Sequence, residues 1–215
     1  MKKAYLFDFD GTLANSMPDW TGKVFHVLNQ THTPYPPDLI RQVVTLGDRG
    51  AAEYLRNTLG VPLETEEILR QMDAYALPKY RDEIRLKAGV TEYLSRLRQR
   101  GCEVHVLTAS PHKMVDPCLK RTGIYDWFGH VWTCEDLALS KSQPEIYRKV
   151  MQLLELPISA GVFFDDSPLA IQAAARAGLF AVGVYDEASA DYAGEMRRCA
   201  DLYIQDFRQI LNTDI

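Results

Sequence analysis

The chain has 215 residues, of which 47% are hydrophobic and 25% charged, and its formal net charge is −5. This length allows one α/β domain with an insertion, or two small domains. The acidic balance argues against nucleic acid or an anionic membrane as the main partner, and no stretch approaches the roughly 20 apolar residues of a membrane span. Four widely spaced cysteines without a CxxC pair argue against a disulfide scaffold and a zinc site, which favours a reducing cytoplasmic location.

A short buried strand is predicted at the start of the chain, over residues 4–9, because its apolar run is nearly continuous. Asp8 and Asp10 interrupt this run early, which argues against a secretory leader. Gly11 and Thr12 come next, and the glycine permits a sharp turn and a close approach of the backbone to a ligand.

The next segment, from about residue 16 to residue 85, contains no convincing strand. Its apolar spacing predicts four helices, at about 19–30, 38–45, 49–59 and 66–82, with prolines and glycines between them. A helical insertion directly after the first strand would lie over the carboxyl end of the sheet. Open α/β folds bind their ligands at that end.

Strands and helices alternate in the remainder of the chain. The predicted strands are 103–108, 130–133, 161–164, 180–185 and 202–205, and the predicted helices are 90–100, 112–122, 144–156 and 168–177. Ser167 and Pro168 indicate the start of the last helix, and Gly178 indicates its end. This order predicts an α/β fold with a Rossmann-like, doubly wound parallel sheet. The core would comprise residues 1–15 and 86–215, and a helical cap domain would comprise residues 16–85.

Paired aspartates follow two of the predicted strands. Asp8 and Asp10 end the first strand, and Asp165 and Asp166 follow the apolar run over 161–164. Taken alone, the first pair also fits a solvated Asp-Gly turn, and the second also fits the acidic start of a helix. In a parallel sheet both ends face one crevice, so the four carboxylates can converge. Hard oxygen ligands in that number suit Mg²⁺ rather than zinc.

Two further strand or helix ends carry polar groups. Thr108 and Ser110 end the strand 103–108 and offer hydroxyl groups to a phosphate oxygen, although such hydroxyls also serve local turns and caps. Lys141 precedes the predicted helix 144–156. A solvated surface lysine is the alternative to a lysine that offsets the charge of aspartates and phosphate.

Together these segments resemble the four ordered motifs of the haloacid dehalogenase-like (HAD) superfamily. The matching segments are Asp8-Phe9-Asp10-Gly11-Thr12, then Thr108, then Lys141, then Phe164-Asp165-Asp166-Ser167. The insertion after the first motif is similar to the helical-cap branch, which includes phosphoglycolate phosphatases and β-phosphoglucomutase. The resemblance covers nearly the whole chain, and Lys87-Ala88-Gly89-Val90 and Gly178 also fit it.

The resemblance implies a role for each catalytic position. Asp8 would be the nucleophile that becomes an aspartyl phosphate, and Asp10 the general acid and then the general base. Asp166 would ligate Mg²⁺ together with Asp8 and the Asp10 backbone carbonyl. Asp165, which stands where the branch often has Glu, would ligate the metal directly or through water.

The resemblance also implies a set of residues around the substrate. Thr108 and Lys141 would hold the phosphoryl oxygens. The expected substrate-binding residues are Gly11, Thr12, Ala109, Ser110 and Arg49. The Thr12 hydroxyl is expected to orient Asp10.

The cap is expected to select the substrate. Leu46-Gly47-Asp48-Arg49-Gly50 resembles the cap loop in which relatives place a substrate-facing basic residue. Arg49 is therefore a candidate, with an exposed arginine at a helix start as the alternative. Lys23 and His26 either face the cleft or serve the surface and core packing of the first cap helix. Asn15-Ser16 and Arg85–Gly89 are predicted as hinges.

The predicted function is that of a Mg²⁺-dependent phosphatase acting on a small phosphorylated metabolite. A phosphomutase of the β-phosphoglucomutase type shares the catalytic groups and is one alternative. A non-turnover phosphoacceptor or regulatory binding protein is another, from a different functional class. Nucleic acid and membrane are not expected as partners, and the sequence leaves open whether the protein is a monomer or a dimer.

Overall fold

Six parallel strands form a single sheet in the order β3-β2-β1-β4-β5-β6. The computed structural model describes residues 3–213 and 215. The strands are β1 (Ala4–Phe7), β2 (Glu103–Thr108), β3 (His130–Thr133), β4 (Gly161–Asp165), β5 (Phe180–Val184) and β6 (Leu202–Ile204). All six predicted strands are confirmed, with ends that differ from the predicted ones by at most two residues.

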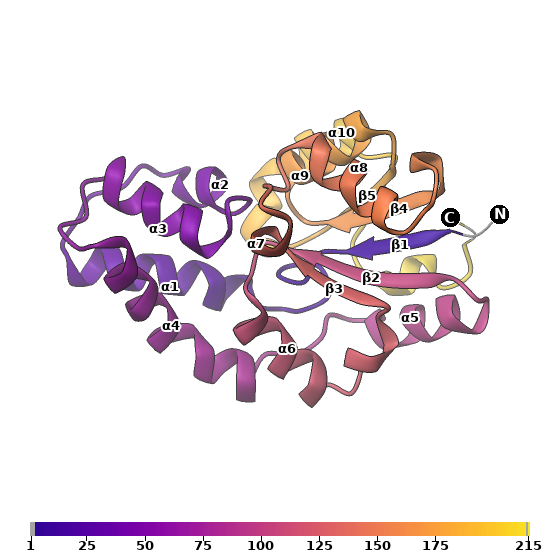
Figure 1. The fold of residues 1–215 in the computed structure, drawn as a ribbon, viewed down its shortest axis with the longest axis horizontal. Helices are drawn as coiled ribbons and strands as arrows, with labels where there is room; N and C mark the ends of the chain where they lie inside the picture. Colours follow the sequence, from indigo (N-terminus) through magenta and orange to yellow (C-terminus); the bar gives the residue numbers. More distant parts are fainter. Residues whose placement is uncertain (1–2, 214) are drawn as a thin grey trace.

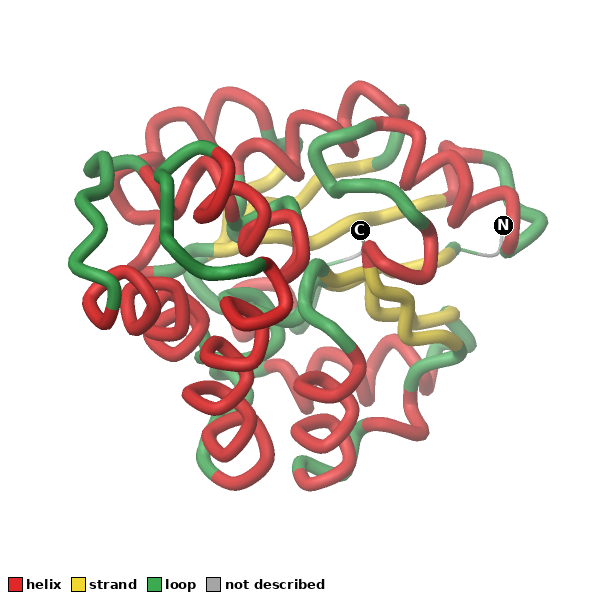
Figure 2. Tube along the Cα trace, turned by 60° about the vertical axis from the view of Figure 1, so that its left-hand side comes forward, coloured by secondary structure: helices red, strands yellow, loops and turns green. Residues whose placement is uncertain are grey.

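Helices cover both faces of this sheet, as Figures 1 and 2 show. One face packs against α5 (Val90–Gln99) and α6 (His112–Arg121), and the other against α8 (Pro144–Leu153), α9 (Pro168–Ala177) and α10 (Ala193–Cys199). Tyr5 and Phe7 of β1 belong to the first of these cores, whereas Ala4 and Leu6 belong to the second. Side chains that alternate between two buried faces explain the continuous apolar run of β1.

Two short helices were not predicted from the sequence, namely α10 and α7 (Cys134–Leu137). α7 has four residues, too few for a helical period to appear in the sequence. A capping box forms it instead. The Thr133 hydroxyl accepts a hydrogen bond from the Asp136 backbone N–H, and the Thr133 backbone N–H donates to the Asp136 carboxylate.

The helical insertion consists of α1 (Met17–Gln30), α2 (Leu39–Val43), α3 (Gly47–Asn57) and α4 (Thr65–Asp82). It has a hydrophobic core of its own, which includes Trp20, Val24, Leu55 and Met72. Figure 1 shows the insertion beyond the carboxyl end of β1, on the side opposite the chain termini.

The insertion leaves and rejoins the core through two adjacent chain segments. The Asn15 backbone N–H donates to the Arg85 carbonyl over 2.9 Å, and Ala14 and Leu86 form an antiparallel bridge. Lys87 strengthens the junction, because its ammonium donates to the Gly11 carbonyl over 2.6 Å and to Asp186 Oδ2 over 3.0 Å. None of the helices in residues 3–213 combines the length and apolarity needed to cross a membrane.

The strand order determines where the polar motifs meet. The chain runs outward from β1 through β2 to β3, and then returns to the other side of β1 with β4, β5 and β6. β1 is hydrogen-bonded to β2 and β4, the strands that end at Thr108 and Asp165. A reversal of strand order opens a crevice at the carboxyl ends, and the insertion lies over it.

Candidate active site

Asp8 follows β1 and lies beside a buried lysine. Lys141 Nζ is 2.7 Å from Asp8 Oδ1 and 2.8 Å from Asp165 Oδ2, and at most 6% of any of these three side chains is exposed. Asp165 is held in this position by a second contact, because its Oδ1 accepts a hydrogen bond from the Ser167 N–H over 2.7 Å. Lys141 therefore bridges the ends of β1 and β4.

Asp166 completes an acidic group that can hold a metal ion. Asp8, Asp165 and Asp166 each place a carboxylate oxygen within 4.8 Å of the others. Gly11 makes room for this group. Its φ is +71°, and a Cβ atom there would lie 2.5 Å from Asp166 Oδ2. Three buried carboxylates with one neighbouring ammonium suit a hard divalent cation such as Mg²⁺.

The electrostatics of this group indicate the same need for positive charge. Burial, together with the Asp165 and Asp10 carboxylates, raises the pKa of Asp8 to about 8 against the opposing effect of the Lys141 ammonium. Burial and the charges of Asp165 and Asp8 raise the pKa of Asp166 well above its usual range. A proton or a cation relieves such repulsion between neighbouring carboxylates.

Asp10 lies in a different environment, in which hydroxyl groups surround its carboxylate. Ser16 donates to Oδ1 over 2.6 Å, Tyr80 donates to the same oxygen, and Ser110 donates to Oδ2 over 2.6 Å. Ser16 lies at the N-cap position of α1, yet its hydroxyl is used for Asp10 rather than for a helix cap. The three donors fix the orientation of the Asp10 carboxylate.

This arrangement corrects one prediction. The Thr12 hydroxyl was expected to orient Asp10, but both Asp10 oxygens receive other donors. Thr12 Oγ1 is buried and has no hydrogen-bond partner among the described residues. Ser110 was predicted as a phosphate donor, and the structure places its hydroxyl on Asp10.

Other predicted residues lie at the same end of the sheet. Thr108 is fully buried and its Oγ1 accepts a hydrogen bond from the Ser110 N–H over 3.1 Å, which is a local turn contact. Ala109 is nearly buried between Thr108 and Ser110. A hydrogen bond holds the backbone of Lys141, because the Tyr147 hydroxyl donates to the Lys141 carbonyl over 2.7 Å.

The predicted cap residues have separate locations. Arg49 lies on α3 with 53% of its side chain exposed, and it forms an ion pair with Glu66 at 2.9 Å. Lys23 is fully buried and forms an ion pair with Asp48. His26 packs on the ring of Tyr75 within the insertion. Of the three, Lys23 is the one whose side chain is fully buried.

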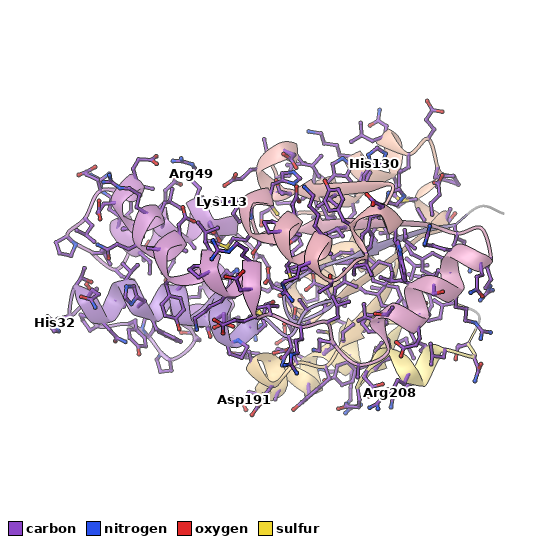
Figure 3. All side chains as sticks on the ribbon, turned by 90° about the horizontal axis from the view of Figure 1, so that it is seen from below. His32, Arg49, Lys113, His130, Asp191 and Arg208 are labelled. Carbon is purple, nitrogen blue, oxygen red and sulfur yellow. The ribbon has the colours of Figure 1, made fainter. Side chains whose placement is uncertain are left out.

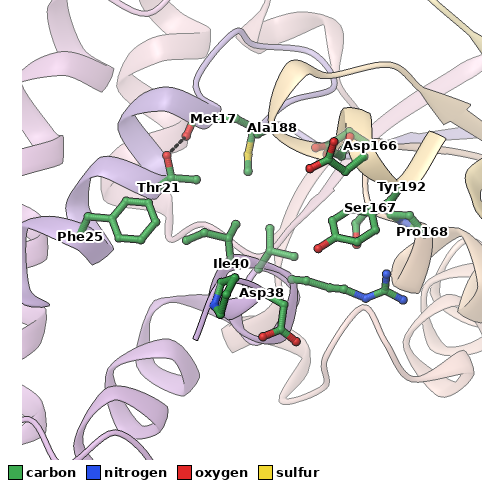
Figure 4. Close-up of a pocket in the computed structure, with 15 residues that line it drawn as sticks. Met17, Thr21, Phe25, Asp38, Ile40, Asp166, Ser167, Pro168, Ala188 and Tyr192 are labelled. Carbon is green, nitrogen blue, oxygen red and sulfur yellow. Dashed lines mark hydrogen bonds between the residues drawn. The ribbon is translucent and has the colours of Figure 1, made fainter. Parts of the chain in front are cut away.

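A cavity of about 280 Å³ connects the insertion to the metal-binding group. Met17, Thr21 and Phe25 of α1 line one side, and Asp166 and Ser167 line the other, as Figure 4 shows. Its walls are mostly apolar on the side of the insertion. The cavity provides a route to the carboxylates at the end of β4.

Sequence reasoning missed Tyr80 and Ser16, which both donate to Asp10. Tyr80 is fully buried, and burial and the nearby Asp10 carboxylate raise its pKa well above 10. The available signal was position, because Ser16 belongs to the predicted hinge at 15–16 and Tyr80 lies five residues before the predicted hinge at 85–89. A polar side chain beside a hinge is well placed to reach the crevice from the insertion.

The family-level comparison agrees with this geometry. The family model for the haloacid dehalogenase-like hydrolases matches residues 2–178. The chain belongs to the haloacid dehalogenase-like hydrolase family. The predicted superfamily, the Rossmann-like fold and the assignment as a phosphatase are therefore confirmed.

Similar proteins span almost the same length. Validoxylamine A 7'-phosphate phosphatase of Streptomyces hygroscopicus subsp. limoneus is 27% identical, over 98% of this chain and 96% of the relative. Phosphoglycolate phosphatase of Pectobacterium atrosepticum is 30% identical, over 83% of this chain and 78% of the relative. The crystal structure of a predicted phosphoglycolate phosphatase from Haemophilus somnus is 26% identical, with a TM-score of 0.77, and covers 98% and 96% of the two chains.

Proposed function

We propose that this phosphatase is Mg²⁺-dependent and hydrolyses a small phosphorylated metabolite through an aspartyl phosphate formed on Asp8. The observation that supports this most strongly is the contrast between two neighbouring carboxylates. Asp8 faces Lys141 and the metal-binding group, whereas Asp10 is held by three hydroxyl groups. This contrast supports Asp8 as the nucleophile and Asp10 as the acid and base.

The first proposed step transfers the phosphoryl group to the protein. An Asp8 carboxylate oxygen attacks phosphorus, the ester P–O bond breaks, and Asp10 gives its proton to the departing oxygen. Lys141 and the Thr108 hydroxyl stabilise the charge on the phosphoryl oxygens. Thr12 Oγ1, buried without a partner among the described residues, offers a further donor at this site.

The second proposed step restores Asp8. Asp10, now a carboxylate, takes a proton from water as that water attacks phosphorus, and the bond between Asp8 and phosphorus breaks to release phosphate. Ser16, Tyr80 and Ser110 keep Asp10 in one orientation through both steps. Asp165 keeps Lys141 in place.

Asp8, Asp166 and the Asp10 carbonyl would hold Mg²⁺, which would shield the nucleophile from the anionic substrate and stabilise phosphoryl charge. Asp165 would contribute mainly through Lys141, because both of its oxygens already accept hydrogen bonds from the protein. The helical insertion would act as the cap. A cytoplasmic location and the oligomeric state stay predictions.

The relatives identified by sequence are named phosphatases, which favours hydrolysis over the phosphomutase alternative. The test measures phosphate release from p-nitrophenyl phosphate and a panel of metabolite phosphates, with Mg²⁺ or with EDTA. Wild type should turn over with Mg²⁺ only, and Asp8→Asn should fall to background. Asp126→Asn, an exposed aspartate outside the crevice, is the matched control.

The intermediate has its own measurement. Borohydride reduces an acyl phosphate to an alcohol, so mass spectrometry of protein quenched during turnover should find residue 8 reduced to homoserine. Stoichiometric labelling of residue 8 without steady phosphate release would instead favour the phosphoacceptor alternative. No hydrolysis of any ester with Mg²⁺ would sink the proposed function.

A further inference from the structure

A second buried lysine lies in the insertion, and the proposed chemistry does not use it. Lys23 on α1 and Asp48 on α3 form an ion pair of 2.6 Å, and their side chains are 0% and 2% exposed. Lys23 Nζ also lies 3.7 Å from the Met114 sulfur of α6 and 5.0 Å from the centre of the Trp20 ring. The pair therefore reaches from the insertion to the core.

The pair has unused hydrogen-bonding capacity. Asp48 Oδ2 is buried and has no hydrogen-bond partner in the described part of the chain. The Lys23 ammonium has three N–H donors, of which one goes to Asp48 Oδ1 and one faces the weak acceptor of Met114. A buried carboxylate oxygen without a partner is costly, and a hydroxyl group of a ligand would satisfy it.

The pair lies close to the groups that surround Asp10. Gly47, the residue before Asp48, packs so closely that a Cβ atom there would be 3.1 Å from the Ala109 carbonyl oxygen. The Asp48 charge acts on the Tyr80 hydroxyl, which itself donates to Asp10. Asp48 therefore lies near the groups that orient Asp10, within the insertion that covers the crevice.

The surrounding charges do not favour a second anionic group. Near the pair, Arg49 is bound to Glu66, and Lys113 of α6 is bound to Asp73 at 2.6 Å. Both cations line a cavity of about 410 Å³ between insertion and core, and Figure 3 shows them at that boundary. Five carboxylates and three guanidinium or ammonium groups line this cavity, Asp48 among them. The carboxylates therefore outnumber these cations, and the excess negative charge repels a carboxylate or a second phosphate on the leaving group.

We propose that Lys23 and Asp48 determine substrate specificity by binding neighbouring hydroxyl groups of an uncharged, polyhydroxylated leaving group. Asp48 Oδ2 accepts a hydrogen bond from one hydroxyl, and Lys23 donates to the oxygen of the next. Because the pair is neutral as a whole, it rejects a leaving group with a carboxylate at the same place. This inference deepens the proposed phosphatase function and rests on it.

The test compares substrates that differ in one group. Glycerol 3-phosphate and 3-phosphoglycerate form one matched pair, and glucitol 6-phosphate and 6-phosphogluconate form a longer one. In each pair a CH₂OH group replaces a carboxylate. Wild type should prefer the polyol in at least one pair, by about tenfold or more in kcat/KM.

The two single variants should move this preference in opposite directions. Asp48→Asn leaves the Lys23 charge uncompensated, so the ratio of polyol to acid should fall about tenfold. Lys23→Met leaves the Asp48 charge uncompensated, so the ratio should rise. A purely structural ion pair would lower both activities and leave the ratio unchanged, because its loss acts on both substrates alike.

Folding is monitored by thermal unfolding, and Lys23→Met/Asp48→Met removes both charges together if a single variant does not fold. The folded double variant should lose the polyol preference. Glu64→Gln, which breaks an exposed pair with Arg56 in the same insertion, is the control and should keep the wild-type ratio.

Three results would overturn the inference while leaving the phosphatase function intact. They are a wild-type preference for the acid in both pairs, single variants with ratios within twofold of wild type, and a folded double variant with the wild-type ratio. A protein that hydrolyses neither these esters nor p-nitrophenyl phosphate would remove the proposed function as well.

Discussion

Among the described residues, two lysines are buried beside carboxylates, and their surroundings differ. Lys141 in the core contacts Asp8 and Asp165, with Asp166 close by. Lys23 in the insertion contacts Asp48. The core site has more buried carboxylates than cations, whereas the insertion has a balanced pair.

The difference indicates what each place requires from a ligand. Burial, and then the charges of neighbouring carboxylates, raise the pKa values of Asp8 and Asp166, so this group favours an added cation. The pair in the insertion favours an uncharged hydrogen-bonding partner, since its charges already cancel. The proposed catalytic site and the proposed specificity site thus use the same two residue types in different proportions.

The largest effect is expected from removing the lysine of the core site. Lys141→Met removes the cation that faces Asp8, so kcat should fall by about 10²–10³-fold on every phosphate ester. Steady-state kinetics on p-nitrophenyl phosphate and a polyol phosphate measure it. Lys149→Met, an exposed lysine of α8, is the control. A loss confined to one substrate would show that Lys141 acts in selection instead.

Gly11→Ala tests the spatial requirement of the acidic group. The new Cβ would overlap Asp166 Oδ2, and φ at this position is +71°, so affinity for Mg²⁺ should fall about 10–100-fold. Activity measured against Mg²⁺ concentration shows the shift. Gly60→Ala is a close control, because Gly60 has a φ of +75° with nothing within 4 Å of its Cβ position. Equal effects of the two changes would mean that backbone strain alone is responsible.

Tyr80→Phe tests a contact between the insertion and the core, because the hydroxyl of Tyr80 on α4 donates a hydrogen bond to Asp10 of the core. Loss of one of three donors should lower kcat about tenfold, because hydrogen bonds to charged groups contribute about 1.5–3 kcal/mol. Kinetics on p-nitrophenyl phosphate measure it, with Tyr93→Phe as a buried tyrosine control. Unchanged kcat in Tyr80→Phe would remove Tyr80 from the orientation of Asp10.

The smallest effect is expected where a charged cluster is exposed. Partial burial lowers the pKa of His112, but hydrogen bonds to Asp116 and Asp136 outweigh it, and the net pKa is raised above 6.5. The stabilisation is fully present below pH 6.5 and is lost as the pH rises through the raised value. Since His112 is 43% exposed, this stabilisation of the folded protein should be under about 1 kcal/mol.

Urea unfolding at pH 5.5 and pH 8.5 measures this contribution. His112→Gln should lose stability at pH 5.5 and little at pH 8.5. The control is His32→Asn, because His32 is exposed with a φ of 51°, and Asn tolerates that backbone conformation. A stability loss in His112→Gln that is equal at both pH values would contradict the protonation argument.

The sequence predicted the sheet because its central strands β1 and β4 are buried on both faces and therefore largely apolar. It also predicted the residues at the strand ends, because Asp8, Thr108 and Asp165 lie on neighbouring parallel strands. The four helices of the insertion were recognisable from their periodicity.

Contacts across the insertion boundary could not be predicted in the same way. Tyr80 and Ser16 reach Asp10, and Lys23 reaches Met114, through the angle at which the insertion meets the core. No periodic pattern encodes that angle. The expected role of Thr12 was wrong because donors from elsewhere in the chain already hydrogen-bond both oxygens of Asp10.

The junction between Asn15 and Arg85 has a consequence for how such a protein changes over time. Because these residues are hydrogen-bonded neighbours, the whole insertion between them is connected to the core at one place. A segment of another length or shape can replace it as a cassette, without moving a strand of the sheet. Such a replacement can change substrate choice, provided that it still supplies donors to Asp10, as Ser16 and Tyr80 do here.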